Sequence, residues 1–258
     1  MHKDSISKTI MVATALCVVC AILVSTAAVQ LKPLQERNKV LETKRNILEA
    51  AGLMTEGGDI EQLFEQIEPR LVDLNTANFT DAFDPAKYDE RRAAKDPGLS
   101  EKIPGKDIAK IRRRAKVVKI YLVKDGDQLQ TIILPLYGKG LWSTMYAFIA
   151  LDADGNKVKG LTFYDHGETP GLGGEVENPL WKNLWPGKLI YDEKGEIAIQ
   201  VIKGKAKRQG PQAMHTIDGL GGSTLTTRGV NNLVRYWLGE EGFAPFLRNL
   251  IKQGGKNG

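Results

Sequence analysis

The stretch GGSTLTTRGVNN, residues 221–232, carries groups that could bind an anion or form an ester with one. Two glycines precede four hydroxyl side chains, those of Ser223, Thr224, Thr226 and Thr227. Apolar residues then recur at the spacing of an amphipathic helix, which we expect over residues 227–238. Backbone N–H groups at a helix N-terminus lack intrahelical partners, and glycines allow close approach, so the stretch predicts a phosphate or other anion site. A threonine N-cap after a glycine turn is the alternative interpretation.

A second candidate stretch, DHGETPGLGGEVENPLW, covers residues 165–181 and contains one of the three histidines. It is longer than a hairpin connection requires, which predicts a binding loop. The segment GLGGEV lacks the last glycine of a dinucleotide-binding fingerprint. We expect no metal here either, because no known ligand spacing matches the candidate donors Asp165, His166, Glu168 and Glu175.

The elements that must position these two stretches are short β-rich runs between residues 117 and 202. Three pairs of runs, each separated by a turn signal that ends in glycine, predict three antiparallel hairpins. Successive hairpins, rather than alternating strands and helices, indicate an α+β domain with a curved antiparallel sheet. The expected hairpins pair residues 116–123 with 129–136, 145–152 with 158–164, and 189–192 with 197–202.

Residues 9–31 carry no charge. A helix of that length rises roughly 34 Å, which is enough to cross a hydrocarbon core of about 30 Å. We interpret the segment as a transmembrane anchor in contact with membrane lipid. A cleaved signal peptide is the alternative, although its apolar region is usually shorter. The lysines and arginines that flank the segment favour a cytoplasmic body when they are counted alone.

Helical spacing predicts a helix over residues 34–51, ending near Gly52, and a second helix over residues 60–71. Residues 75–105 have no clear period, so we expect an irregular connection there. Cys17 and Cys20 lie inside the apolar run and serve as small, lipid-compatible side chains rather than as a redox or metal pair. The net charge of +5 is dispersed among 31 acidic residues, which argues against a nucleic-acid partner.

Three motifs in a fixed order carry a resemblance to a known family. They are YGKGLW at residues 137–142, HGETPGLG at residues 166–173 and DGLGGSTLTTRGV at residues 218–230. Through these motifs, and over essentially its whole length, the chain resembles the C subunit of the sodium-translocating NADH:quinone reductase. More distantly, its body is similar to the G subunit of the Rnf complex and to other FMN-binding domains of that superfamily.

In that family FMN is joined through its phosphate to a threonine hydroxyl, in a motif approximating Asp-x-x-Ser-Gly-Ala-Thr. Asp218 begins the matching segment and Thr224 ends it, so the resemblance implies covalent attachment at Thr224. Gly221 and Ser223 depart from the motif, which leaves Ser223 and Thr226 as competing acceptors. The resemblance implies further FMN-binding residues at Leu141, Trp142, Glu168, Thr169, Gly171, Leu172, Gly222, Ser223, Leu225 and Thr226.

The resemblance implies an electron-carrying subunit of a complex that couples NADH oxidation and ubiquinone reduction to sodium export. No NADH or quinone site is evident in the sequence, and we expect no catalytic residues in this chain alone. The implied partners are the other subunits of the complex and a flavin transferase that attaches the FMN. The family also implies a single-pass protein of the bacterial inner membrane with a periplasmic body, against the charge count.

The implied organisation has five parts. They are a short tail at 1–8, a transmembrane helix at 9–31, a helical and irregular connecting segment at 32–105, an FMN-binding domain at 106–251 and a flexible tail at 252–258.

Three other functions stay open at this point. The chain could be the FMN-carrying subunit of an Rnf-type ferredoxin:NAD oxidoreductase. It could be a membrane-tethered hydrolase that uses Ser223 with Asp218 and either His215 or His166, although Ser223 lacks the G-x-S-x-G elbow. It could also be a non-catalytic assembly module that binds an anion at the same helix end.

Overall fold

The computed structural model describes residues 5–55 and 57–254. The chain divides into two compact units, residues 1–43 and 44–258. Residues 1–4 and 255–258, which belong to the two predicted tails, lie outside the described residues. The helices α1 (Ile6–Ala51) and α6 (Ala244–Gly254) extend into the parts of the tails that are described.

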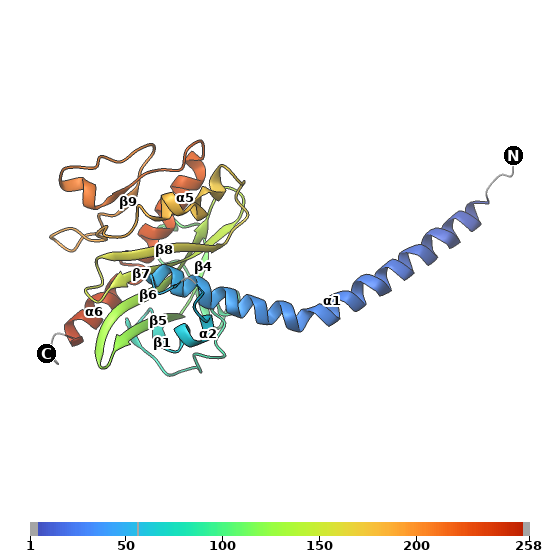
Figure 1. Ribbon diagram of the computed structural model, residues 1–258, viewed down its shortest axis with the longest axis horizontal. Coiled ribbons are helices and arrows are strands. Elements are labelled where there is room, and N and C mark those ends of the chain that lie inside the picture. Colours follow the sequence, from blue (N-terminus) through green and yellow to red (C-terminus); the bar gives the residue numbers. More distant parts are fainter. Residues whose placement is uncertain (1–4, 56, 255–258) are drawn as a thin grey trace. The chain divides into compact units, whose positions relative to one another are not determined.

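The first unit consists of the greater part of one long helix, α1, which spans Ile6–Ala51 (Figure 1). This helix contains the whole predicted anchor, residues 9–31, so the helical prediction is confirmed. Its most apolar window has a mean hydropathy of 2.5 and is fully exposed. Among the described residues it is the one helix long and apolar enough to cross a membrane. Pro33, which lacks a backbone donor, lies inside it.

The second unit is built on a six-stranded antiparallel sheet with the order β2-β1-β5-β6-β7-β8. Two of the three predicted hairpins are confirmed, β5 with β6 and β7 with β8. They turn at Gly126 and Gly155, whose φ angles of +58° and +66° favour glycine. The strands are β1 (Ile67–Asp73), β2 (Asn78–Phe79), β5 (Val117–Asp125), β6 (Gln128–Lys139), β7 (Thr144–Asp152) and β8 (Val158–Asp165).

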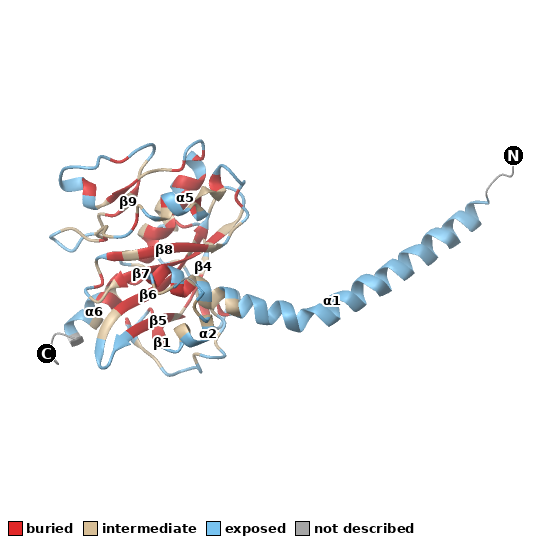
Figure 2. Cartoon of the chain, in the orientation of Figure 1, coloured by how far each residue is buried: buried red, intermediate tan, exposed pale blue. Residues whose placement is uncertain are grey.

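Most residues of the central strands are buried (Figure 2), and their apolar side chains belong to two separate clusters. On β6, Ile132 and Leu134 belong to the core shared with α5 (Thr224–Trp237) and α6 (Ala244–Gly254). Ile133 points to the opposite face, where the last turn of α1 packs. This alternation is the period-2 pattern of a strand buried on two sides, and it makes β6 and β7 the rigid centre of the domain.

The remaining elements are short and border the sheet. They are α2 (Ile60–Phe64), α3 (Glu90–Ala93), β3 (Ser100–Lys102), β4 (Arg113–Ala115), η1 (Gly173–Glu177), α4 (Pro179–Lys182), β9 (Gln200–Val201), η2 (Pro211–Met214) and β10 (Thr216–Ile217). The segment of residues 75–105 contains only the short elements β2, α3 and β3, in agreement with the expected irregular connection.

The predicted second helix, residues 60–71, is wrong beyond Phe64, because β1 begins at Ile67 and pairs with β5 along its whole length. Pro69 explains the difference. A helix through this position would lose a hydrogen bond and clash with the preceding turn. In β1, Pro69 lies where β2 no longer pairs, and a missing donor is tolerated at a sheet edge.

The third predicted hairpin, residues 189–202, forms only in part. Its turn is present, since Asp192 N and Glu196 O are hydrogen-bonded at 3.0 Å, but Tyr191 and Ile197 make a single isolated bridge. The second run instead supplies β9, which pairs in parallel with β10. In addition, Val201 N donates to the side chain of Asn231 on α5 at 3.0 Å. Local pairing is therefore limited to the residues near the turn, and contacts distant in sequence hold the end of the second run.

Candidate functional site

The helix α5 begins at Thr224, three residues earlier than the sequence predicts. Ser223 occupies the N-cap position, yet its side chain makes no capping hydrogen bond. At the start of α4, by contrast, Asn178 caps the helix by accepting from Leu180 N at 2.9 Å. The first turn of α5 therefore leaves backbone N–H groups available to a ligand, as an anion site requires.

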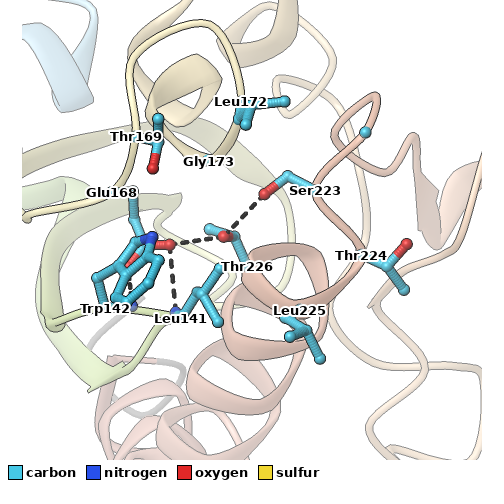
Figure 3. Close-up of a pocket in the computed structure, with 11 residues that line it drawn as sticks. Leu141, Trp142, Glu168, Thr169, Leu172, Gly173, Ser223, Thr224, Leu225 and Thr226 are labelled. Carbon is cyan, nitrogen blue, oxygen red and sulfur yellow. Dashed lines mark hydrogen bonds between the residues drawn. The ribbon is translucent and has the colours of Figure 1, made fainter.

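A pocket lies between the start of α5, the 140–143 turn and the loop that follows β8 (Figure 3). The structure brings Thr224 and nine of the ten other predicted FMN-binding residues to this pocket. Gly171 is absent from its lining, and Gly173, which the sequence prediction missed, is present. The lining residues are Leu141, Trp142, Glu168, Thr169, Leu172, Gly173, Gly222, Ser223, Thr224, Leu225 and Thr226.

Glu168 ties the three parts of the pocket together. Its side chain is buried, and Oε1 accepts from Trp142 N at 3.0 Å, while Oε2 accepts from Leu141 N at 3.2 Å and from Thr226 Oγ1 at 2.6 Å. Burial by itself raises the pKa of Glu168, but the hydrogen bonds from Thr226 and from the 140–143 backbone outweigh it and lower the pKa. Glu168 is therefore a buried, ionised carboxylate that fixes the turn against α5.

The four hydroxyls of the acceptor segment differ sharply in exposure. Ser223 Oγ donates to Thr226 Oγ1 at 2.9 Å, and Thr226 in turn donates to Glu168 (Figure 3). Thr227 Oγ1 accepts from Leu220 N at 3.0 Å. These three side chains are buried, whereas Thr224 is exposed at the pocket. Only the Thr224 hydroxyl is both exposed and outside this internal network.

Two glycines let the backbone approach the Glu168 carboxylate. A Cβ on Gly140 would lie 2.5 Å from Oε1, and a Cβ on Gly173 would lie 2.6 Å from Thr226 Oγ1 and 2.9 Å from Oε2. Neither distance is possible between real atoms, so a side chain at either position would displace the carboxylate. No local sequence signal points to Gly173, because its approach to Glu168 and Thr226 depends on the fold.

Four of the pocket side chains are apolar and exposed: Leu141 at 39 %, Trp142 at 65 %, Leu172 at 45 % and Leu225 at 53 %. Apolar side chains gathered around a cleft with a few placed polar groups are typical of cofactor sites. The arrangement can hold a flat aromatic group between the apolar side chains and an anion near Gly222, whose backbone has a φ of +70°.

The structure does not show the nucleophile–base arrangement that the hydrolase alternative requires. Ser223 bonds to Thr226, and His215 Nδ1 contacts Leu189 O at 2.9 Å, so neither forms a nucleophile–base pair with the other. His166 Nδ1 accepts from Glu168 N at 3.2 Å, and its Nε2 lies 3.0 Å from Glu177 Oε1 without hydrogen-bond alignment. Among the described residues no His, Cys, Asp or Glu cluster could hold a metal ion.

Residues 140–239 match the family model of the FMN-binding domain. This range contains the whole pocket, from Leu141 to Thr226. The fold and the site thus define a protein that joins one long apolar N-terminal helix to an FMN-binding domain.

Similar proteins show to which family of FMN-binding proteins the chain belongs. The C subunit of the Na(+)-translocating NADH-quinone reductase from Yersinia pestis is 50% identical over 263 residues, with 100% of this chain and 97% of the relative covered. The same subunit from Pseudomonas aeruginosa is 49% identical, with 97% and 98% covered. The chain belongs to the family of the C subunit of the Na(+)-translocating NADH-quinone reductase.

A solved structure agrees with this assignment. The crystal structure of NqrC from Shewanella oneidensis is 38% identical and superposes with a TM-score of 0.75, covering 82% of this chain and 97% of that one. The predicted fold, an apolar helix followed by an α+β domain with an antiparallel sheet, is therefore confirmed.

Proposed function

We propose that this chain carries electrons through FMN bound covalently at Thr224, as a subunit of a membrane complex that couples NADH oxidation and ubiquinone reduction to sodium export. The family of the chain and its FMN-binding domain support this function. The full-length similarity to the quinone-reductase subunit favours it over an Rnf-type complex. When bound, FMN supplies a ring that accepts and releases electrons, and the protein holds and orients it.

One observation carries the assignment of the acceptor: of the four hydroxyl-bearing residues in 223–227, Thr224 is the one that is exposed, and it lines the pocket. Modification of Thr226 would break its bond to Glu168, and modification of Ser223 would break the bond that it donates to Thr226. A modified Thr224 disturbs neither bond. A phosphate ester there would lie at the N-terminus of α5, where the helix dipole favours negative charge.

In the proposed attachment step, the FMN half of FAD is transferred to the Thr224 hydroxyl. The Thr224 oxygen attacks the phosphorus of the FMN half, and a new phosphorus–oxygen bond forms. The bond from that phosphorus to the bridging oxygen breaks, so AMP leaves. The hydroxyl proton passes to a base of the magnesium-dependent flavin transferase that binds FAD. No electrons move in this step.

The pocket residues fit the ring as well as the phosphate. Leu141, Trp142, Leu172 and Leu225 expose apolar surface that a flat ring would cover, and such burial contributes about 25 cal/mol per Å². The exposed side chain of Thr169 can meet a polar ring edge.

The long apolar helix supports a single-pass protein of the bacterial inner membrane. The remaining subunits of the complex and the flavin transferase are its proposed partners. We place the domain on the periplasmic side, as the family resemblance implies. A reporter fused after residue 258 tests this side of the membrane: activity confined to a reporter that works only in the cytoplasm would contradict it.

The acceptor is tested by Thr224→Val, which keeps the β-branched shape and removes the nucleophile. The helix should still form, because the network of Ser223, Thr226 and Glu168 is intact. Both variant and parent are produced in cells that contain the transferase. The mass of the tryptic peptide of residues 209–228 should include FMN in the parent and lose it completely in the variant.

Ser223→Ala is the matched control, since it removes a neighbouring hydroxyl that is buried. It should keep the adduct. An adduct on Ser223 or Thr226 of the Thr224→Val variant would show that the acceptor is misassigned. A parent without any adduct, in cells with a working transferase, would refute covalent attachment.

A further inference from the structure

Asp218 begins the acceptor motif, yet it lies outside the pocket lining. Its Oδ1 accepts from Ala206 N at 2.8 Å, and its Oδ2 accepts from Arg208 Nη2 at 2.7 Å. The Asp218 side chain is only 14% exposed. Its carboxylate therefore faces residues 203–208, and not the Thr224 hydroxyl.

Residues 203–208, KGKAKR, form what we call the cationic loop. Further contacts dock this loop on the acceptor segment: Gly219 N donates to Gly204 O at 2.8 Å, and Ala206 is buried. On the other side, Trp181 Nε1 donates to Asp218 O at 2.8 Å. The loop is thus held in place by backbone bonds as well as by the carboxylate.

The charged side chains of this loop are all positive. Lys203, Lys205, Lys207 and Arg208 are all exposed, and no acidic residue occurs between Glu196 and Asp218. Lys188 lies close enough to this group for the charge of Arg208, together with burial, to lower the pKa of Lys188. Asp218 is the carboxylate that this segment meets, and it offsets one charge.

The cationic loop lies near Thr224 along the chain. Four residues separate Gly219, which the loop contacts, from Thr224, so the path between the two Cα atoms is at most about 18 Å when fully extended. The true path is shorter because the chain turns, with Ser223 N donating to Leu220 O at 3.2 Å. Lysine side chains from the loop can extend across part of this gap.

We propose that Asp218 is a positioning residue for FMN attachment: it holds the cationic loop beside Thr224, where the lysines attract the diphosphate of the flavin nucleotide donor. This inference rests on the proposed covalent attachment at Thr224. The lysines complement the negative charge of the diphosphate at the bond that breaks, and the N-terminus of α5 complements the phosphate that stays.

The loop is tested with the full-length chain in detergent, with FAD, magnesium and a purified flavin transferase. Incorporated flavin is followed by its fluorescence. The double variant Lys205→Glu/Lys207→Glu should react about tenfold more slowly at saturating acceptor and low salt, and the difference should shrink as salt screens the charges. The matched control is Lys102→Glu/Lys106→Glu, which makes the same charge change at two exposed lysines elsewhere and should react like the parent.

The role of Asp218 is tested by a double-mutant cycle. Asp218→Asn should slow the reaction, and reversal of Lys205 and Lys207 should then cost much less than in the parent, since the loop no longer sits beside Thr224. A role of Asp218 in folding alone would leave the cost of the loop variant unchanged. That result would overturn its assignment as a positioning residue.

The remaining outcomes separate the two proposals. A parent that takes up no flavin contradicts the covalent attachment itself. A flavinylated parent with a loop variant of equal rate and equal salt dependence contradicts only the present inference. A loop variant that raises the KM for the acceptor chain, with no change in rate at saturation, would mean that the loop binds the transferase protein and not the nucleotide, which also overturns the inference.

Discussion

The pKa values of two carboxylates, Glu168 in the pocket and Glu90 at the start of α3, are shifted in opposite directions. Glu168 is almost fully buried, yet hydrogen bonds from Thr226 and the 140–143 backbone lower its pKa. Glu90 is partly buried as a residue, and the one hydrogen bond to its carboxylate, from Lys119 N, is 3.4 Å long. Burial of that carboxylate raises the pKa of Glu90 to about 8. The donors that each carboxylate meets decide which of the two stays ionised.

The comparison also separates two roles. Glu168 joins segments that lie far apart in the sequence, and every bond that it accepts helps to shape the pocket. Glu90 belongs to the short helix α3 and faces Lys119 of β5. An ionised Glu168 is therefore a structural requirement of the site, whereas an ionised Glu90 costs stability.

Glu168→Ala should have the largest effect on stability and tests whether Glu168 holds the site together. The variant leaves the buried Thr226 hydroxyl and the N–H groups of Leu141 and Trp142 without an acceptor, so we expect it to lower the free energy of unfolding by about 3 kcal/mol. Urea titration of the full chain in detergent measures this. Glu193→Ala, at an exposed turn position, is the control and should change stability by less than about 0.5 kcal/mol. Equal effects of the two variants would mean that Glu168 does not hold the site.

Glu90→Gln tests the contrast between the two carboxylates through the pH dependence of the free energy of unfolding. Because the folded pKa of Glu90 is raised from 4.5 to about 8, its contribution is most favourable below pH 4.5 and is lost as the pH rises through 8. The variant should therefore become more stable than the parent over this window, by about 1 kcal/mol at pH 8 once its partial exposure is allowed for.

Glu168 should behave in the opposite sense in the same titrations. Its folded pKa is lowered from 4.5, so its stabilising contribution is present above pH 4.5 and is lost as the pH falls further. The difference in the free energy of unfolding between the parent and Glu168→Ala should therefore narrow as the pH falls below 4.5, because the contribution of the ionised carboxylate is lost. Urea titrations between about pH 2 and 8 check both trends. A Glu90→Gln gap that is independent of pH would contradict the contrast.

The sequence predicts the central hairpins well because their signals are local. Apolar runs with β-branched and aromatic residues flank Asp125-Gly126 and Asp154-Gly155, and the glycines adopt the positive φ that such turns need. β1 was missed because Ile67 and Leu71 fit a helical spacing, while the partner that makes them a strand lies some 50 residues away in β5. The third hairpin forms only in part for the same kind of reason, since β10 and Asn231 bind the end of its second run.

For the pocket, the resemblance brought together residues that no periodicity connects. The bond between Thr226 and Glu168 joins positions 58 residues apart, and nothing local in either motif predicts it. Hence the sequence left Ser223 and Thr226 open as acceptors, although the structure buries both. The part played by Gly173 was missed for the same reason, because a close approach to Glu168 depends on the fold.

The smallest effects on stability should come from the side chains that surround the pocket without holding it. Trp142 donates a hydrogen bond to Glu168 through its backbone N–H, and the residue is 65% exposed. Trp142→Ala should therefore keep the Glu168 bonds and change the free energy of unfolding by about 0.5 kcal/mol or less. Leu172→Ala, at 45% exposure, should behave similarly. Both variants should remain flavinylated, yet shift the absorbance and potential of the FMN if their side chains contact the ring. Unchanged spectra and potential, together with a loss of several kcal/mol as in core truncations, would make these residues part of the core instead.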